Sequence, residues 1–259
     1  MCRPCALITA NYHCQLPLFM LLLSLDTSTT VCSVALHNNG GLLGCYELFT
    51  ERTSSAMLTT LIGNVVQHAG FALSDLDAVA VAKGPGSYTG LRIGVSTAKG
   101  LCFALDKPLL SVNTLQAMTE QVRPFFLPTA NCRSVGPPLS TLFCPMIDAR
   151  RMEVYCVFYD QMGGEVKPTA AEIIDENSFA DLLIDYSIVF FGDGAAKCRA
   201  VLGEHPNAHF LDELIRPSAR TIGILATDGF RAGRFENLAT FEPFYLKEFM
   251  TTTPKKAVA

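Results

Sequence analysis

The sequence predicts an α/β protein made of two similar lobes, each built around a mixed β-sheet. The first observation is a repeated order, because each half opens with short strands joined by tight turns and continues with helices and further strands. The second is composition: 49% of the 259 residues are hydrophobic and 17% are charged, against about 25% charged in an average domain. A chain of this length and hydrophobicity can bury the cores of two such lobes.

The first half begins with an antiparallel meander followed by an amphipathic helix. The turn Asn38–Gly41 is a strong hairpin signal, because Asn and Gly tolerate positive φ. Apolar residues recur at helical spacing between 57 and 66, and Gly70 ends the pattern. The predicted strands of this half span 21–25, 31–37, 42–49, 76–82 and 109–112, and the predicted helices span 53–69 and 90–105.

The second half repeats this order more loosely. Proline is frequent between 124 and 140, which indicates a loop or a junction between the lobes. We expect an N-terminal lobe over 20–112 and a C-terminal lobe over 113–246. The predicted strands of the second half span 142–148, 152–159 and 187–191, and the predicted helices span 176–184, 195–202 and 218–230.

The N-terminal residues superficially resemble a secretion signal. However, their most apolar part continues directly into the first predicted strand, and no A-x-A cleavage site separates the two. We therefore expect the folded domain to begin at Met20, with 1–19 a loose extension and 247–259 a C-terminal tail. The remaining apolar runs are too short to cross a bilayer, so no membrane association is expected.

Charge and cysteine usage narrow the class of protein. The formal net charge is −4, which argues against a strong nucleic-acid footprint formed by this chain alone. Of the ten cysteines, only Cys2 and Cys5 approach the spacing of metal ligands, and one C-x-x-C pair is a weak signal. Most of the others lie singly in apolar runs, which is typical of reduced core thiols in a cytoplasmic protein.

The stretch KGPGSYTGLRIGVSTAKG, residues 83–100, is the most distinctive motif. It differs from a Walker loop, because Leu91 and Arg92 follow Gly90 where Lys and Ser or Thr are required. It also differs from the dinucleotide fingerprint, since its glycines are spaced G-x-G-x-x-x-G. An anion site at Gly84 and Gly86 remains open, because free N–H groups converge at a helix N-terminus.

The helix that leaves this loop carries small residues on one face. Gly90, Gly94 and Ala98 are four residues apart, and each glycine in a helix costs about 1 kcal/mol relative to alanine. A close neighbour should offset that cost. The neighbour is either this protein's own sheet or first helix, or a helix of another subunit. Arg92 lies beside this face.

Five segments together resemble the bacterial TsaB family: SLDTST, KGPGSYTGLRIG with STAKGL, SVNTLQAM, IDARRMEVY and FGDGA. The similarity extends from Met20 to about Leu246. It implies a two-lobed, duplicated fold of the actin, hexokinase and Hsp70 type, which is ribonuclease H-like. It also implies a role in forming N6-threonylcarbamoyladenosine at position 37 of tRNAs that read ANN codons. In that family the transfer is carried out by the related subunit TsaD, assisted by the ATPase TsaE.

Comparison with the catalytic relative predicts that this chain holds no metal, no cofactor and no catalytic residue. The relative carries H-x-x-x-H after V-N, whereas Thr114 and Met118 stand at these two places here, and neither is a plausible ligand. The superfamily's first phosphate loop reads D-x-G-x-T, but Ser28 follows Asp26 where glycine is expected. Gly192 and Gly194 are either an echo of an adenosine-binding loop or an ordinary turn.

Three functions follow from this resemblance and remain open at this stage. The favoured one is a partner subunit without activity of its own, which binds a TsaD-like subunit and a TsaE-like ATPase, can form a homodimer, and meets tRNA only through the complex. The others are a metallopeptidase and a small-substrate enzyme that uses ATP, with Asp26 and Asp193 as its candidate residues. The predicted partner interface lies on helices 54–69 and 90–105 and comprises Leu58, Leu61, Gly90, Arg92, Gly94 and Ala98.

Overall fold

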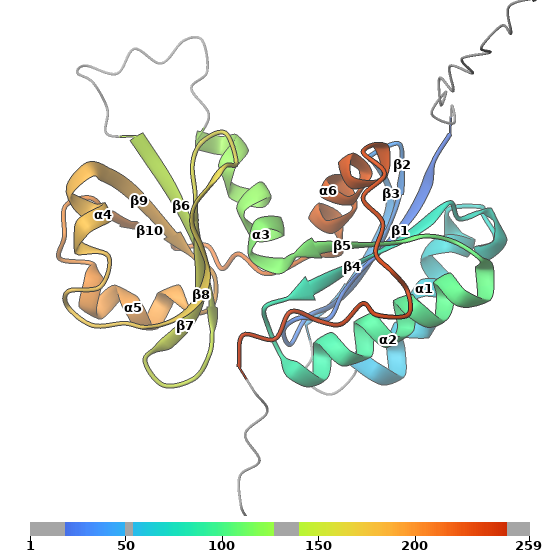
Figure 1. Ribbon diagram of the computed structural model, residues 1–259, viewed down its shortest axis with the longest axis horizontal. Helices are drawn as coiled ribbons and strands as arrows, with labels where there is room; N and C mark the ends of the chain where they lie inside the picture. The colour runs from blue at the N-terminus through green and yellow to red at the C-terminus, as the bar shows by residue number, and fades with distance from the viewer. Residues whose placement is uncertain (1–18, 50–53, 127–139, 248–259) are drawn as a thin grey trace, which may run out of the picture.

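The computed structural model describes residues 19–49, 54–126 and 140–247. Two lobes lie side by side, each with a five-stranded sheet at its centre (Figure 1). The predictions for the N-terminal extension before Phe19, for Cys2 and Cys5, for the tail after Lys247 and for most of the Pro-rich stretch concern residues outside the described ranges. Within these residues, no helix is long and apolar enough to cross a membrane.

The first sheet has the strand order β3-β2-β1-β4-β5. β1 pairs antiparallel with β2 and parallel with β4, so the meander lies at one edge and the parallel strands at the other. Both faces of β1 are buried, which explains why its residues form a continuous apolar run rather than an alternating one. The strands are β1 (Leu21–Asp26), β2 (Cys32–Asn38), β3 (Gly41–Leu48), β4 (Ala78–Gly84) and β5 (Leu109–Asn113).

The second sheet repeats the first. Its order is β10-β9-β6-β7-β8, so the first strand of this half again lies in the middle, between an antiparallel meander and parallel strands. This duplication confirms the predicted two-lobed fold class. The strands are β6 (Ser140–Asp148), β7 (Glu153–Tyr159), β8 (Glu165–Ile173), β9 (Tyr186–Phe191) and β10 (Ala208–Phe210).

Helices cover both faces of the first sheet. α1 and α2 enclose one core with β1, β2 and β4, while α6 packs on the opposite face against β1, β2, β4 and β5 (Figure 1). In the second lobe, α4 and α5 pack near β9 and β6. The helices are α1 (Ser54–His68), α2 (Tyr88–Leu105), α3 (Thr114–Val122), α4 (Ala180–Asp185), α5 (Ala195–Leu202) and α6 (Ala219–Arg231), with short 3-10 turns η1 (Leu73–Asp75) and η2 (Arg123–Phe126).

The division between the lobes differs from the predicted one. Helix α6 was assigned by its position in the chain to the C-terminal lobe, but it packs on the first sheet. The segment after α6 also returns to the first lobe, where Phe241 joins the core beneath α1 and α2. The apolar face of α6 is buried against apolar residues of the first sheet. Hydrophobic burial depends on which apolar surfaces can pack together and not on the order of the elements in the chain.

Helix α3 lies between the lobes. Leu115, Met118 and Val122 enter a core with β6, β7 and β9 of the second lobe, whereas Ala117 packs with α6 and the first sheet. The helix is therefore buried on both sides, and it connects the packing of the two lobes.

Candidate functional site: the glycine-rich loop and helices α1 and α2

The glycine-rich loop joins β4 to α2 and is held by the chain itself. Gly84 ends β4 with φ +115°, a backbone conformation that residues other than glycine rarely adopt. Ser87 caps α2, because its Oγ accepts a hydrogen bond from the amide of Gly90 at 3.3 Å. The amide of Ser87 donates to the carbonyl oxygen of Ser28 at 2.6 Å. The loop is thus bonded to the turn between β1 and β2.

Three glycines of the motif are required by contact with that same turn. A Cβ atom on Gly86 would lie 2.2 Å from the carbonyl oxygen of Ser28, and one on Gly90 would lie 2.0 Å from that of Thr27. A Cβ on Gly94 would lie 2.4 Å from Thr27 Oγ1. The Thr27 hydroxyl also donates to the Gly90 carbonyl at 2.7 Å. The small-residue face of α2 therefore meets the protein's own backbone.

This corrects the predicted partner interface. Gly90, Gly94 and Ala98 are buried against the protein's own first lobe, and Leu58 and Leu61 of α1 lie in the core of that lobe. None of these five residues presents a surface to a partner, because all of them are buried within the first lobe. Thr27 occupies the space beside Gly90 and Gly94. The spacing of small residues along α2 does not reveal that this neighbour belongs to the same chain.

The outer faces of α1 and α2 carry a different set of residues. A Cβ atom added to Gly63 on α1, or to Gly100 on α2, would meet nothing within 4 Å. Phe103, one turn beyond Gly100 on the same helix, is 83% exposed. Arg92, the one predicted interface residue that is exposed, lies with its guanidinium 4.8 Å from the centre of the Tyr88 ring. Intramolecular packing explains neither open glycine.

Asp26, at the end of β1, is the most buried carboxyl of the first lobe. Its Oδ1 accepts hydrogen bonds from the amide and the hydroxyl of Ser28, at 2.8 and 2.6 Å. Its Oδ2 has no partner among the described residues. Burial raises the pKa of Asp26 to about 6, against the lowering effect of the two Ser28 hydrogen bonds. Asp26 and Ser28 thus bond to each other in the turn that follows β1.

The raised pKa of Asp26 predicts how stability changes with pH. The folded form holds this proton more tightly than the unfolded chain, so the contribution is complete below about pH 3.8 and is lost as pH rises through about 6. The shift corresponds to roughly 2–3 kcal/mol. We therefore expect the free energy of unfolding of wild type, minus that of Asp26→Asn, to fall by about this amount between pH 4 and pH 8. Urea titrations at both pH values measure it, and equal differences at the two would contradict the burial of a titrating carboxyl.

Gly192 and Gly194 lie in the turn from β9 into α5. A Cβ on Gly192 would lie 2.3 Å from the Met146 carbonyl oxygen and 2.8 Å from Met118 Cε, so this glycine is required by packing. The Gly194 amide donates to the same Met146 carbonyl at 3.0 Å. The Gly192–Gly194 turn is thus packed against the end of β6.

The two positions that correspond to the relative's histidines are core positions. Thr114 starts α3 and is fully buried, and Met118 lies in the core that α3 shares with the second lobe. Among the described residues, no group of three or more His, Cys, Asp and Glu side chains is arranged to hold a metal ion. Cys102 is a buried thiol, and burial raises its pKa to about 11.

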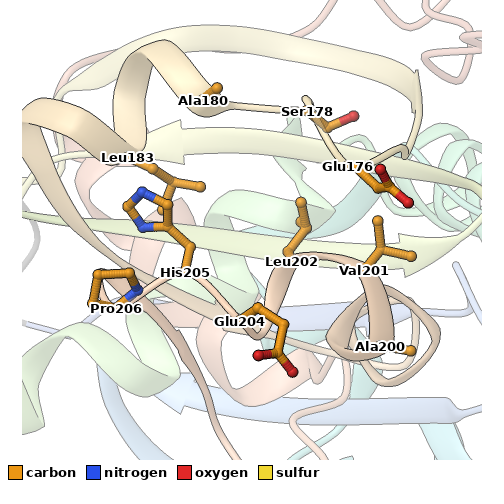
Figure 2. A pocket seen from close by; sticks show the side chains of 10 residues that line it. All are labelled: Glu176, Ser178, Ala180, Leu183, Ala200, Val201, Leu202, Glu204, His205 and Pro206. Atoms are coloured by element: carbon orange, nitrogen blue, oxygen red, sulfur yellow. The ribbon is translucent and has the colours of Figure 1, made fainter.

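A surface cavity in the second lobe was not predicted from the sequence. It has a volume of about 530 Å³ and lies between the start of α4 and the end of α5 (Figure 2). Glu176, Glu204 and His205 line it together with apolar side chains. His205 Nδ1 accepts from the amide of Asn207 at 3.2 Å. These side chains come from short surface segments, and no sequence motif marks them.

This chain is similar to known proteins over most of its length. The family model described as TsaD, tRNA N6-adenosine threonylcarbamoyltransferase, matches residues 34–252. The tRNA threonylcarbamoyladenosine biosynthesis protein TsaB of Escherichia coli is 29% identical over 235 residues, which are 88% of this chain and 95% of that protein. The Bacillus subtilis protein of the same name is 32% identical over 145 residues, 56% of this chain and 57% of the relative.

A solved structure agrees with these sequence matches. YeaZ from Pseudomonas aeruginosa superposes with a TM-score of 0.71 at 28% identity, covering 88% of this chain and all of that one. The fold and the site thus define a duplicated α/β protein whose glycine-rich loop is packed by its own chain. The chain belongs to the TsaB family of glycoprotease-like proteins.

Proposed function

We propose that this chain takes part in tRNA threonylcarbamoyladenosine biosynthesis as a partner subunit without catalytic activity of its own. In this proposal it binds a TsaD-like catalytic subunit, with a TsaE-like ATPase assisting, and supports threonylcarbamoyl transfer to adenosine 37 of ANN-reading tRNAs. The names of its relatives support the pathway. The partner role is supported by the outer faces of α1 and α2.

The observation that carries the partner role is an exposed aromatic ring on α2 one turn from an open glycine, with a second open glycine on the neighbouring helix α1. Gly63 and Gly100 each cost about 1 kcal/mol relative to alanine within a helix, and no contact among the described residues offsets that cost. Close approach of another helix would offset it. An exposed Phe in the same region is the kind of side chain that dominates the energy of a protein interface. We define the residues Gly63, Gly100 and Phe103 as the outer patch.

The burial of three candidate residues supports the proposal that this chain has no catalytic activity of its own. Asp26 is 1% exposed and bonded to Ser28, and Thr114 and Met118 are buried by α3 packing. A substrate would therefore have to displace core contacts to reach any of them. The proposed chemistry thus belongs to the catalytic relative, and this chain contributes a surface.

Two exposed phenylalanines provide a matched test of the outer patch. Phe103 on α2 is 83% exposed and Phe125 in η2 is 84% exposed. If Phe103 is a central contact, Phe103→Asp should weaken binding of a TsaD-family subunit by about 30-fold or more, as for an interface hot spot. Phe125→Asp should leave the affinity unchanged. Both changes lie on the surface and should alter folding stability by about 0.5 kcal/mol or less.

Analytical size exclusion and calorimetric titration with the catalytic subunit measure this difference. Equal affinities of the two variants would exclude the outer patch, and failure of wild type to bind at all would exclude the partner role. Size exclusion of the chain alone shows whether it forms a homodimer. If the outer patch forms the dimer contact, Phe103→Asp should elute as a monomer.

A further inference from the structure

The segment that follows α6 crosses from one lobe to the other. It leaves α6 at the first lobe, where the amide of Glu236 donates to the Leu109 carbonyl at 2.9 Å. It then runs along α2 and ends against the second lobe (Figure 1). We call residues Phe241–Lys247 the strap.

Contacts of Phe241 and Phe244 fix the strap to the first lobe. Phe241 is buried in the core, and its carbonyl oxygen accepts from Lys99 Nζ of α2 at 3.0 Å. The amide of Phe244 donates to the Lys83 carbonyl at 2.7 Å. The Phe244 carbonyl oxygen lies where a Cβ on Gly84 would come within 2.8 Å. The strap therefore covers one side of the glycine-rich loop, and the turn after β1 covers the other.

The strap also contacts the first residue of α2. The rings of Tyr245 and Tyr88 lie 4.7 Å apart between their centres, and the Arg92 guanidinium lies over the Tyr88 ring. Offset aromatic pairs at this distance are favourable beyond their burial. The start of α2 is thus connected to the end of the described chain.

The contact with the second lobe comes from Lys247. Its ammonium forms an ion pair with the carboxylate of Glu153 at the start of β7, and it lies 5.9 Å from the centre of the Tyr155 ring. The side chains of Lys247 and Glu153 are 37% and 23% exposed, so the pair is accessible to water. An ion pair of this kind is weak, and it can open without unfolding either lobe.

We propose that the strap couples the two lobes, with the Lys247–Glu153 pair as a latch that transmits the position of the second lobe to the glycine-rich loop and the start of α2. After the latch opens, the strap is held beside Lys83 by one backbone hydrogen bond of Phe244 and by the Tyr245–Tyr88 ring contact, so it lifts from Lys83 more often than in the latched form. The proposal concerns the chain alone and does not depend on the proposed function.

Hydrogen exchange of the full-length chain tests the latch. Lys247→Ala should accelerate exchange of the Phe244 amide and of the amides at Gly86–Tyr88 by about three- to fivefold, the range expected for loss of a partly exposed ion pair. Glu153→Gln, a change in the other lobe, should have the same effect at the same amides. The Glu153 backbone, which accepts from Lys197, is left intact by this change.

A second ion pair in the same lobe is a close control. Lys167 pairs with Glu172 at side-chain exposures of 41% and 32%, and lies 5.2 Å from the centre of the Phe179 ring. Lys167→Ala removes an equivalent set of contacts away from the strap, so it should leave exchange at Phe244 and the loop unchanged.

The double variants decide whether the two residues act as one latch. Lys247→Ala with Glu153→Gln should be no faster than either single change, and the reversed pair Lys247→Glu with Glu153→Lys should restore protection. Unchanged exchange in Lys247→Ala, an equal effect of Lys167→Ala, or additive single changes would each overturn the proposal.

Discussion

Replacing Gly90 by alanine should lower the free energy of unfolding by about 3 kcal/mol or more, the upper part of the range for overpacking. The added Cβ would lie 2.0 Å from the carbonyl oxygen of Thr27, and backbone cannot retreat as a flexible side chain can. The change would also separate the Thr27 hydroxyl from the carbonyl that it bonds. Helix propensity alone predicts the opposite sign, since alanine is favoured over glycine by about 1 kcal/mol.

Gly100 supplies the control for this prediction, because it lies on the same helix with open space around it. Gly100→Ala should raise stability by about 0.5–1 kcal/mol through helix propensity alone. Thermal and urea unfolding of the two variants measure the contrast. Similar effects of both changes would contradict the assignment of the Gly90 face to internal packing. That face would then be accessible to a partner, as first predicted.

Most of the first lobe could be predicted from periodicity and turn chemistry. β1, β2 and β3 follow from apolar strand patterns on either side of an Asn-Gly turn, and the helix after the glycine-rich loop follows from its apolar spacing. Repetition of the meander predicted three strands of the second sheet, β6, β7 and β9, which lie in the same order as β1, β2 and β4 of the first. Local patterns suffice where the residues that contact one another are close in the chain.

Strands β8 and β10 and helix α3 were missed, and β8 and α3 were missed for different reasons. β8 contains Pro168, which argues against a strand, but β8 lies at the edge of its sheet where a missing N–H is tolerated. Helix α3 did carry a signal: the Asn113 side chain caps it by accepting from the amide of Leu115 at 2.9 Å, and apolar residues follow at helical spacing. That cap, after a short strand, could have identified the helix.

The site illustrates what a single sequence leaves undecided. Small residues at Gly90, Gly94 and Ala98 predict a close neighbour but not which neighbour, and Thr27 supplies it from 63 residues away in the chain. Gly63 and Gly100 are the opposite case, because the space beside them is open. The sequence alone does not distinguish such glycines from those that pack against a neighbour. The Lys247–Glu153 pair depends on two lobes meeting, so no local pattern announces it.

The largest effect that we expect is on tRNA itself. If this chain is required for threonylcarbamoyl transfer, cells depleted of it should lose most of the threonylcarbamoyladenosine in their bulk tRNA. Wild-type chain supplied in trans should restore the nucleoside, and Phe125→Asp should restore it equally well. Phe103→Asp should restore much less, because its exposed ring lies on the proposed partner surface while its fold is unaffected.

Mass spectrometry of nucleosides from digested tRNA, with the depleted and complemented strains compared side by side, tests the central claim most directly. The partner role predicts a loss on depletion that wild type and Phe125→Asp reverse and Phe103→Asp does not. Threonylcarbamoyladenosine at an unchanged level after depletion would contradict it.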